Sequence, residues 1–528
     1  MARGERIPVF ALVLGLVAVA MLGPAFMAAT DGEWRVARGF FYAALFTGVS
    51  GGILGLALAN RPVGGSARRE LGVLLLCWLI VPLFAAVPLV LLTPSIGLGG
   101  AVFEMVAAFT TTGGTAYYDP AGLPRAIHLW RGTVGWLGGL LTLTGAYVVL
   151  APRRLGGFEI EAATWRMQEA RRGSVIRLGT GTAPLEARVR RALRVILPIY
   201  GVLTAALGLL LSSAGQSEIE AIVHAMSILA TSGISPNPDG FAGAPNLGAE
   251  VLAGAFLVVA ASRRVYADAA EFGSRQPLSR DPEVWTMAAL VAAVSVSLFL
   301  RHWIGALTLD LPGEPIDPLE AAWGMLFTAL SFLTTTGFVS GFWETARDWS
   351  GWANPGLILL ALAAIGGGAA TTAGGIKLIR AYALMRHGLR EIERIAQPYS
   401  IIGVGARTRS LIREGPTIVW TFMMLFIFAI VASVLALTAL GLGFVDAVVG
   451  AISAISNTGP AFALVTERAD GFAGLAEAER AVLAATMIVG RFETLALVAL
   501  FNPDAWRAHR PRRERSGKSG GEGPLSGW

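Results

Sequence analysis

The chain has 528 residues, of which 54% are hydrophobic and only 15% are charged. Soluble domains carry about 25% charged residues, and apolar stretches of roughly 20 residues, enough to cross a bilayer, recur here, so a soluble protein is excluded. The net charge is +6, but the basic residues lie mainly between the apolar stretches, which argues against a nucleic-acid partner. The single cysteine excludes an internal disulfide, and five scattered histidines argue against a bound transition metal.

The first two apolar stretches, at about 7–28 and 39–59, stand apart from the rest of the chain. The first follows a short basic start, as a secretory signal peptide would. Its length and the absence of a small-residue cleavage site favour a retained helix. Residues 1–70 are therefore predicted to form a leading segment of two transmembrane helices.

Eight longer apolar stretches follow in four pairs, and a polar, glycine-rich segment separates the two members of each pair. Each such segment is too long for a turn between helices and holds an apolar run too short to cross a bilayer. The pairs are 71–92 with 133–151, 191–213 with 248–266, 283–303 with 353–386, and 416–441 with 479–501. They predict pore units at 71–151, 191–266, 283–390 and 416–503, a cytoplasmic linker at 152–190 and a basic, disordered tail at 504–528.

In each intervening segment, a similar small-residue motif follows the short apolar run. The four motifs read AFTTTGGTAYYD (108–119), ILATSGISPNPDGF (228–241), FLTTTGFVSGF (332–342) and AISNTGPAF (454–462). A single Thr-Thr-Gly has no meaning by itself, because small residues in membrane helices often serve only close packing. Four copies at nearly even intervals, each between two spans, instead indicate a repeated functional loop.

Glycine-containing loops at membrane depth suit the passage of a cation. Burying an unpaired charge in a low-dielectric medium costs on the order of tens of kcal/mol, whereas rings of backbone carbonyls can replace the water that an ion loses. Glycine gives such loops the conformations they need, and the negative ends of the preceding short helices add to the attraction. Acidic residues near the opposite ends of those helices fit the same dipoles at Glu220, Glu320 and Asp446, whereas Glu104 fits less well.

The distribution of charge predicts how the units are oriented. Arginines crowd the 151–194 segment, whereas 212–248, around the second motif, contains no Lys or Arg. Arginine-rich loops remain on the cytoplasmic side of a membrane, so all four motifs are expected to face outward and both termini to face the cytoplasm. Inverted-repeat transporters would alternate the orientation of the units. The predicted fold is all-α integral membrane: two leading transmembrane helices plus four pseudo-symmetric helix–pore loop–helix units around a central ion pore.

Longer motifs make the chain similar to a known family. They are FTTTGGT (109–115), WRGTVGWLGG (130–139), GGGAATTAGGIKLIRAYAL (366–384), AISNTGPAF (454–462) and GRFETLALVALFNPDAWR (490–507). The chain resembles the Trk/Ktr/HKT superfamily of potassium uptake proteins through about 7–508, and its TrkH branch most closely. The resemblance implies a homodimer in the bacterial inner membrane, with one pore in each protomer. It also implies a gating partner, a cytosolic nucleotide-binding ring of the TrkA or KtrA type, with the nucleotide on that partner and no cofactor on this chain.

The resemblance assigns the four loops to a selectivity filter, where potassium is the substrate. The predicted ion-binding residues are Thr111, Thr112, Gly113, Thr231, Ser232, Gly233, Thr335, Thr336, Gly337, Asn457, Thr458 and Gly459. Each loop offers one glycine where potassium channels have two around a tyrosine. A shorter filter, with looser selectivity between potassium and sodium, is therefore expected.

The resemblance also implies a gate beneath the filter, at the glycine run 366–375 that interrupts the second helix of the third unit; a plain kink is the alternative. Arg491 lies in an apolar stretch, where an ionisable group is a functional candidate. Glu493 is two residues away and faces elsewhere on a helix, so Arg491 needs another partner. The family match places it near the gate, with a structural ion pair as the alternative. The predicted gating residues are Gly366, Gly367, Gly368, Gly374, Gly375, Lys377 and Arg491.

Two other function classes compete with a channel. A secondary transporter coupling potassium to sodium or protons would need a buried carboxylate along the path, and none stands at a filter position. A membrane enzyme would need a nucleophile–base pair, a metal-ligand cluster or a phosphate loop, and the spans contain none of these patterns. A channel-like potassium uptake protein is the predicted function.

Overall fold

The computed structural model describes residues 8–59, 67–153, 155, 184–243, 245–269, 281–308, 318–344, 354–396, 415–468 and 470–501. Every regular element within these ranges is a helix, so the predicted all-α class is confirmed. Most of the predicted linker at 152–190 and the whole predicted tail at 504–528 lie outside the described residues.

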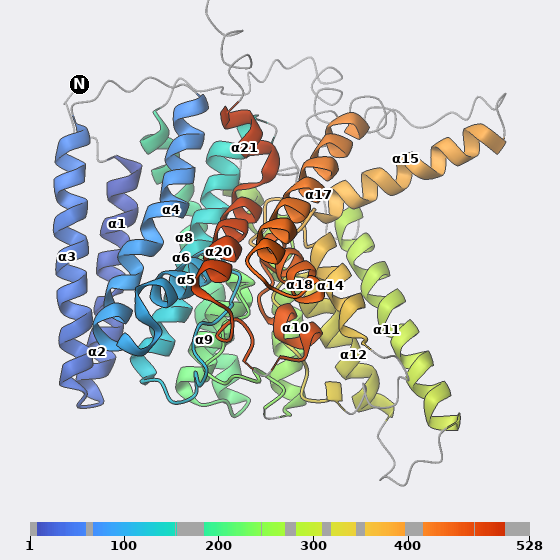
Figure 1. Cartoon of the computed structure of the whole chain (residues 1–528), viewed down its shortest axis with the longest axis horizontal. Helices are drawn as coiled ribbons and strands as arrows, with labels where there is room; N and C mark the ends of the chain where they lie inside the picture. Colours follow the sequence, from blue (N-terminus) through green and yellow to red (C-terminus); the bar gives the residue numbers. More distant parts are fainter. Residues whose placement is uncertain are drawn as a thin grey trace, which may run out of the picture.

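Three helices form the leading segment along one edge of the molecule (Figure 1). They are α1 (Val9–Ala20), α2 (Leu22–Thr30) and α3 (Trp34–Ala59). Both α1 and α2 pack on α3, and α1 also packs on the first helix of the next unit. Leu14 of α1 and Phe40 of α3 are fully buried in the core that this packing creates.

Four units follow, each with a long first helix, then a short helix and one or more further helices. The first holds α4 (Ala67–Leu92), α5 (Gly97–Phe109) and α6 (Arg125–Gly145), which is continued by a π-helical segment at Ala146–Leu150 and a 3-10 segment at Ala151–Arg153. The second holds α8 (Leu185–Ser213), α9 (Glu218–Ala230) and α10 (Leu247–Ala260), followed by a 3-10 segment at Arg263–Ala269. The third holds α11 (Pro282–Thr308), α12 (Pro318–Leu333), α14 (Gly356–Ile365) and α15 (Leu378–Ala396), and the fourth holds α17 (Gly415–Ala439), α18 (Phe444–Ile455), α19 (Pro460–Thr466), α20 (Glu477–Phe492) and α21 (Thr494–Phe501).

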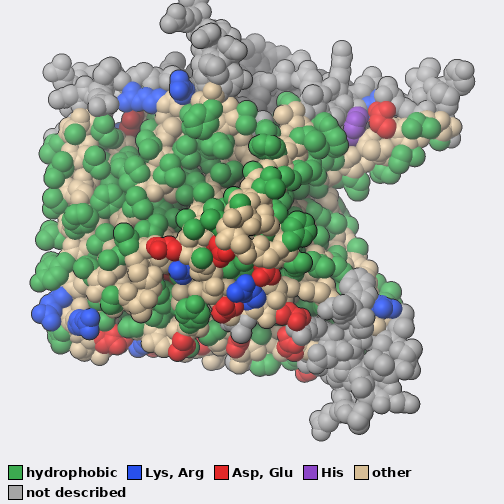
Figure 2. Space-filling model, viewed as in Figure 1, with side chains coloured by type: hydrophobic (Ala, Val, Ile, Leu, Met, Phe, Trp, Pro, Cys, Tyr) green, Lys and Arg blue, Asp and Glu red, His purple; other side chains and the backbone are tan. Residues whose placement is uncertain are grey.

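Seven of the described helices are long and apolar enough to cross a membrane, and Figure 2 shows a broad apolar belt between two ends that carry the charged side chains. The short helices α5, α9, α12 and α18 have 12 to 16 residues. At 1.5 Å per residue they reach only part of the way through a hydrocarbon layer about 30 Å thick. The chain is therefore a multi-pass membrane protein with four short helices that enter its interior.

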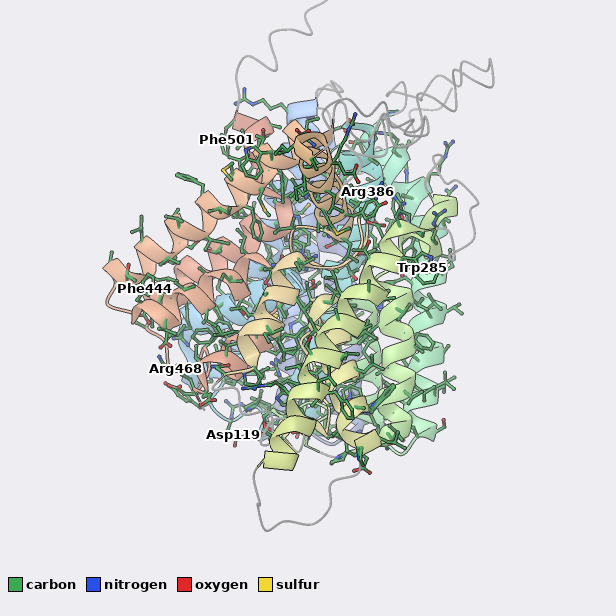
Figure 3. All side chains as sticks on the ribbon, turned by 90° about the vertical axis from the view of Figure 1, so that its right-hand side faces the viewer. Asp119, Trp285, Arg386, Phe444, Arg468 and Phe501 are labelled. Carbon is green, nitrogen blue, oxygen red and sulfur yellow. The ribbon has the colours of Figure 1, made fainter. Side chains whose placement is uncertain are left out.

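The ends of the molecule are distinguished by the segments they carry. In Figure 3, Asp119, the last residue of the first motif, and Arg468, which follows the fourth, lie toward one end. Arg386 of α15 and Phe501 at the end of α21 lie toward the other end. The first and fourth motifs thus open toward the same side, as parallel units require.

Candidate functional site

The four short helices each end in the same unusual backbone turn. The residue two positions before the motif glycine takes the left-handed conformation in every unit, with φ of 53° at Thr111, 50° at Thr231, 60° at Thr335 and 55° at Asn457. Asparagine tolerates this region, but a β-branched threonine there is an outlier and costs about 1–2 kcal/mol. Strain repeated at three equivalent threonines marks a place where the surrounding structure fixes the backbone for a purpose.

The backbone amides at these turns point back into the short helices. The residue after each left-handed position donates its N–H to a carbonyl of its own helix, which is the usual way to close a helix at a left-handed residue. The pairs are Thr112 to Ala107 (2.8 Å), Ser232 to Ser227 (2.8 Å), Thr336 to Ser331 (2.9 Å) and Thr458 to Ser453 (2.9 Å). With these donors occupied, the polar groups left at the turns are chiefly oxygens, which a hard cation prefers as ligands.

The first two turns contact their successors so closely that their glycines have no room for a side chain. A methyl group at Gly113 would collide with the carbonyl oxygen of Ser232, and one at Gly233 would collide with the carbonyl oxygen of Thr336. Both glycines also have positive φ, of 76° and 64°. The first loop thus adjoins the second, and the second adjoins the third.

The third and fourth turns close the ring. A methyl group at Gly337 would lie 3.2 Å from Pro460 of the fourth motif. Gly459 then returns to the first unit, because its N–H donates to the carbonyl oxygen of Thr112 at 2.6 Å. The four loops meet in cyclic order, and of the twelve residues predicted to bind an ion all are buried except Gly113, which is partly exposed.

The short helices bring their negative ends to this ring. Glu220 closes a capping box with Ser217 at the start of α9, and Glu320 and Asp446 lie in the first turns of α12 and α18. Carboxylates at these starts complement the positive ends of the helix dipoles. Glu104 is different, because it lies well inside α5, is 1% exposed and bonds to the chain beyond the turn.

The predicted gate segment lies directly against the ring. The second helix of the third unit stops at Ile365 and resumes at Leu378. Between them, the amide of Gly374 donates to Thr335 Oγ1 at 2.8 Å, and Thr231 Oγ1 bonds to Thr372 Oγ1 at 3.1 Å. Two of the three left-handed threonines, Thr231 and Thr335, therefore use their side chains to hold this segment.

The glycines of the segment allow it to fold on itself and against its neighbours. Gly366 and Gly375 have φ of 75° and 73°, and a methyl group at Gly366 would collide with the carbonyl oxygen of Gly374. Methyl groups at Gly368 and Gly374 would meet the carbonyl oxygens of Ala261 and Ser456. A methyl group at Gly367 would meet the Ala373 side chain. A side chain at any of the five predicted gate glycines would therefore collide with the segment itself or with a neighbouring element. Bulkier residues at these positions would displace the segment.

Arg491 joins the ring to the gate segment. Its Nε donates to the carbonyl oxygen of Thr110 at 2.8 Å, and its two terminal nitrogens donate to Thr372 O and Thr111 Oγ1. The side chain is buried, with 7% of the residue exposed. A full positive charge is therefore held by oxygens at the end of α5 and in the segment, immediately below the turns.

The charges around Arg491 line an open cavity whose lining includes none of the twelve loop residues. Lys377 lies on its wall, is 7% exposed, and donates from Nζ to the carbonyl oxygen of Ala373. Glu493 also lines the cavity, at the break between α20 and α21, with φ of 68°. Its partner is Arg380 at 3.1 Å, so it does not pair with its near neighbour in sequence, as the spacing predicts.

The Arg380–Glu493 pair holds two broken helices together. Arg380 is fully buried and lies 3.7 Å above the ring of Phe422. We expect Arg380→Met to lower the melting temperature of the purified protein clearly, since removing one partner of a buried ion pair costs about 3–5 kcal/mol. The double variant Arg380→Met/Glu493→Met should recover much of that loss. Equal melting temperatures for the wild type and Arg380→Met would show that the pair contributes nothing to stability.

Sequence reasoning assigned no role to several buried charges near the ring and the gate segment. They are Arg131, Glu250, Glu283 and Arg380, each at most 5% exposed. Glu283, for example, accepts the amide of Ala369 at 2.9 Å and so anchors the gate segment to α11. The available signal was a charged residue inside or at the end of an apolar helix, which is costly unless paired and so marks a buried contact.

Comparisons with known proteins place this geometry among cation transporters. Residues 282–507 match the TrkH family, described as cation transport protein. The Trk system potassium uptake protein TrkI of Halomonas elongata is 30% identical over 441 residues, 82% of each chain. The Trk system potassium uptake protein TrkH of Salmonella typhimurium is 27% identical over 482 residues, covering 90% of this chain and 93% of that one.

The fold has a counterpart among solved structures. The crystal structure of the potassium transporter TrkH from Vibrio parahaemolyticus superposes with a TM-score of 0.76 at 24% sequence identity. The match covers 95% of this chain and 99% of that one. The likeness therefore extends over both the leading helices and the four units.

Proposed function

Because the chain belongs to the TrkH family of cation transport proteins, a family of transporters and not of enzymes, we propose that it takes up potassium through the ring of four turns. The single observation that carries the proposal is the closed cyclic contact of the four motif loops at the ends of four inward-pointing short helices. Oxygens from all four sides can replace the hydration shell of a cation. If the loops served only to pack the helices, the strained backbone at their threonines would destabilise the protein without any gain.

The twelve loop residues form the selectivity filter in this proposal. Their carbonyl and hydroxyl oxygens hold a partly dehydrated ion, and the short-helix ends lower the cost of its charge. The contact between neighbouring loops leaves little freedom to widen the ring without moving its neighbours. The filter has one glycine per loop, so discrimination against sodium should be weaker than in a filter with two.

The gate in this proposal consists of residues 366–377 together with Arg491. The segment lies under the turns and is held by Thr231, Thr335 and Arg491 through the bonds described above. A charge fixed on the path repels a cation that leaves the filter, and displacement of the segment would draw that charge aside. Lys377 adds a second positive group on the wall of the cavity.

The orientation in the bacterial inner membrane follows from charge in this proposal. Arginines stand at the starts of α4 and α8 and along α15, the end of the molecule opposite to Asp119 (Figures 2 and 3). Basic segments stay in the cytoplasm. The motif loops then face outward and both termini face inward.

A second copy of the chain is the proposed membrane partner. Helix α15 extends sideways beyond the bundle in Figure 1, and Met385, Leu389 and Ile392 are 48–64% exposed along one side of it. An apolar stripe on a helix that leaves its own bundle suits another protomer and surrounding lipid. The cytosolic partner is a nucleotide-binding ring at the α15 end, and the nucleotide belongs to that ring.

The coupled-transporter alternative is not favoured by the cavity. Glu493 is the carboxylate that lines it, as a proton carrier would. Its oxygen is already engaged by Arg380 at 3.1 Å, so this carboxylate serves an ion pair between two broken helices. Channel-like permeation therefore remains the proposal.

Growth of a potassium-uptake-deficient bacterium at micromolar to millimolar potassium tests the function. The full chain, expressed with a nucleotide-binding partner protein, is expected to restore growth because it supplies the missing entry route. Gly459→Ser should reduce the rescue, since a side chain there would meet Thr112 O at 2.6 Å from its first carbon. Absence of rescue by the wild type, despite expression in the membrane, would contradict the proposal.

A further inference from the structure

Side chains behind the filter loops occupy one repeated position. In three of the four units, the residue at the same distance ahead of the motif glycine bonds to the chain just after that glycine. These residues are Glu104 on α5, His224 on α9 and Thr328 on α12. All three are buried, with 0–2% exposed, so their polar atoms need partners inside the protein.

The first of these contacts is made by a carboxylate. Glu104 Oε2 accepts the amide of Ala116 at 2.7 Å and the hydroxyl of Thr115 at 3.1 Å. Its other oxygen accepts Arg131 Nε of α6 at 2.5 Å. The exit of the first loop is thereby tied to α5 and α6 of its own unit.

The second and third contacts use other chemistry at the same place. His224 Nε2 shares a hydrogen with Ser235 Oγ at 2.9 Å, while its Nδ1 lies 3.0 Å from Gln216 Oε1. Thr328 Oγ1 accepts the amide of Ser340 at 3.2 Å. A carboxylate, an imidazole and a hydroxyl thus perform one task, which indicates that the task is to hold the loop rather than to supply a particular charge.

Two more buried charges connect neighbouring units behind the ring. Arg131 donates to the carbonyl oxygen of Ser235 at 3.5 Å, which joins the first unit to the second. Glu250 of α10 accepts the hydroxyl of Ser340 at 2.6 Å and the amide of Gly341 at 2.7 Å, which joins the second to the third. Glu250 and Arg131 are 0% and 3% exposed.

The fourth unit has no polar side chain at the position equivalent to Glu104, His224 and Thr328. Gly450 stands where the other units have a polar side chain, and a methyl group there would lie 3.4 Å from Leu483 and Phe462. After Gly459 the chain enters α19 at Pro460 directly, so there is no extended exit to hold. The fourth loop is fixed instead through Asn457 Nδ2, which donates to Thr112 Oγ1 at 3.0 Å.

We propose that Glu104, His224 and Thr328 are positioning residues that set the spacing of the filter oxygens and so determine the preference for potassium over sodium. The inference rests on the proposed function. The two ions carry the same charge and differ in size, so a carbonyl ring prefers the larger only while its oxygens are kept from closing inward. Bonds from behind the loops supply that restraint without touching the ion.

The test measures the potassium-to-sodium permeability ratio from reversal potentials, using the purified full chain in planar bilayers with one cation on each side. Thr328→Val keeps the shape and removes the acceptor, and His224→Phe keeps the ring stacked on Phe241 at 4.7 Å but removes both nitrogens. Each should lower the ratio about fivefold, the factor expected for loss of one neutral hydrogen bond. Thr328→Ser, which retains the hydroxyl, should restore it.

Matched controls separate positioning from general damage. Thr144→Val makes the same substitution at a buried site in α6 whose hydroxyl has no partner among the described residues, and it should leave the ratio unchanged. Ser235→Ala breaks the His224 contact from the loop side, so it reports on the contact should His224→Phe fail to fold. Wild-type selectivity in both Thr328→Val and Ser235→Ala would overturn the inference, whereas a wild type that passes no potassium would overturn the proposed function itself.

Discussion

Gly113→Ser is expected to abolish potassium selectivity and to prevent growth rescue at low potassium. Serine at this position must adopt φ of 76°, which costs a residue with a side chain about 1–2 kcal/mol. Its first carbon must also displace the carbonyl oxygen of Ser232, a group of the neighbouring loop. Each 1.4 kcal/mol is a factor of about ten, so the potassium-to-sodium ratio from reversal potentials should fall at least about tenfold.

Gly201→Ser is the matched control for this change. Gly201 lies in α8, has an ordinary helical backbone, and nothing stands within 4 Å of where a side chain would begin. Its substitution should leave both the growth rescue and the permeability ratio at wild-type values. A Gly113→Ser protein with wild-type selectivity would mean that the ring of turns does not select the ion.

Arg491→Ala should increase potassium flux at least about tenfold. At 4 Å, two unit charges in an effective dielectric of about 20 interact by about 4 kcal/mol, and even a third of this changes a rate about tenfold. The substitution also removes the donors to Thr110 O and Thr372 O, so the gate segment is released from α5. Rubidium uptake into liposomes that contain the purified chain measures the change.

Two further substitutions distinguish the charge of Arg491 from its hydrogen bonds. Arg491→Lys keeps a positive group and should keep the flux low, whereas Arg491→Gln keeps a donor without the charge. A high flux in Arg491→Gln would assign the barrier to electrostatics, and a low flux would assign it to the link with Thr372. Unchanged flux in Arg491→Ala would remove the gating role from this residue.

The sequence predicted the four units because the physical requirement repeats. A loop at membrane depth needs flexible residues, and Gly113, Gly233, Gly337 and Gly459 stand between spans at nearly even intervals. The family resemblance and the all-α membrane fold are confirmed. The left-handed turns at the threonines could not be predicted, because threonine has no preference for that conformation and adopts it only under the constraint of its surroundings.

One helix extends beyond its apolar stretch because a charge within it is buried in a pair. The second helix of the first unit begins at Arg125, well before the apolar stretch predicted at 133–151, because Arg131 is neutralised by Glu104 and so is compatible with a buried helix. A hydropathy scale penalises each charged residue and takes no account of a partner that neutralises it in the folded protein. Helical spacing predicts that Glu493 does not pair with Arg491. Its actual partner, Arg380, lies far away along the chain, so only the tertiary structure identifies it.

The hydroxyls of Thr231 and Thr335 link the turns to the gate segment. They belong to residues of the turns, and they bond to the hydroxyl of Thr372 and the amide of Gly374. An ion seated among the turns and a force that pulls residues 366–377 away therefore act on one shared set of bonds. Thermodynamic linkage requires such influences to be mutual. In the proposed pore, any effect of the bound permeant ion on the ease of opening therefore equals, as a factor, the effect of opening on the affinity for that ion.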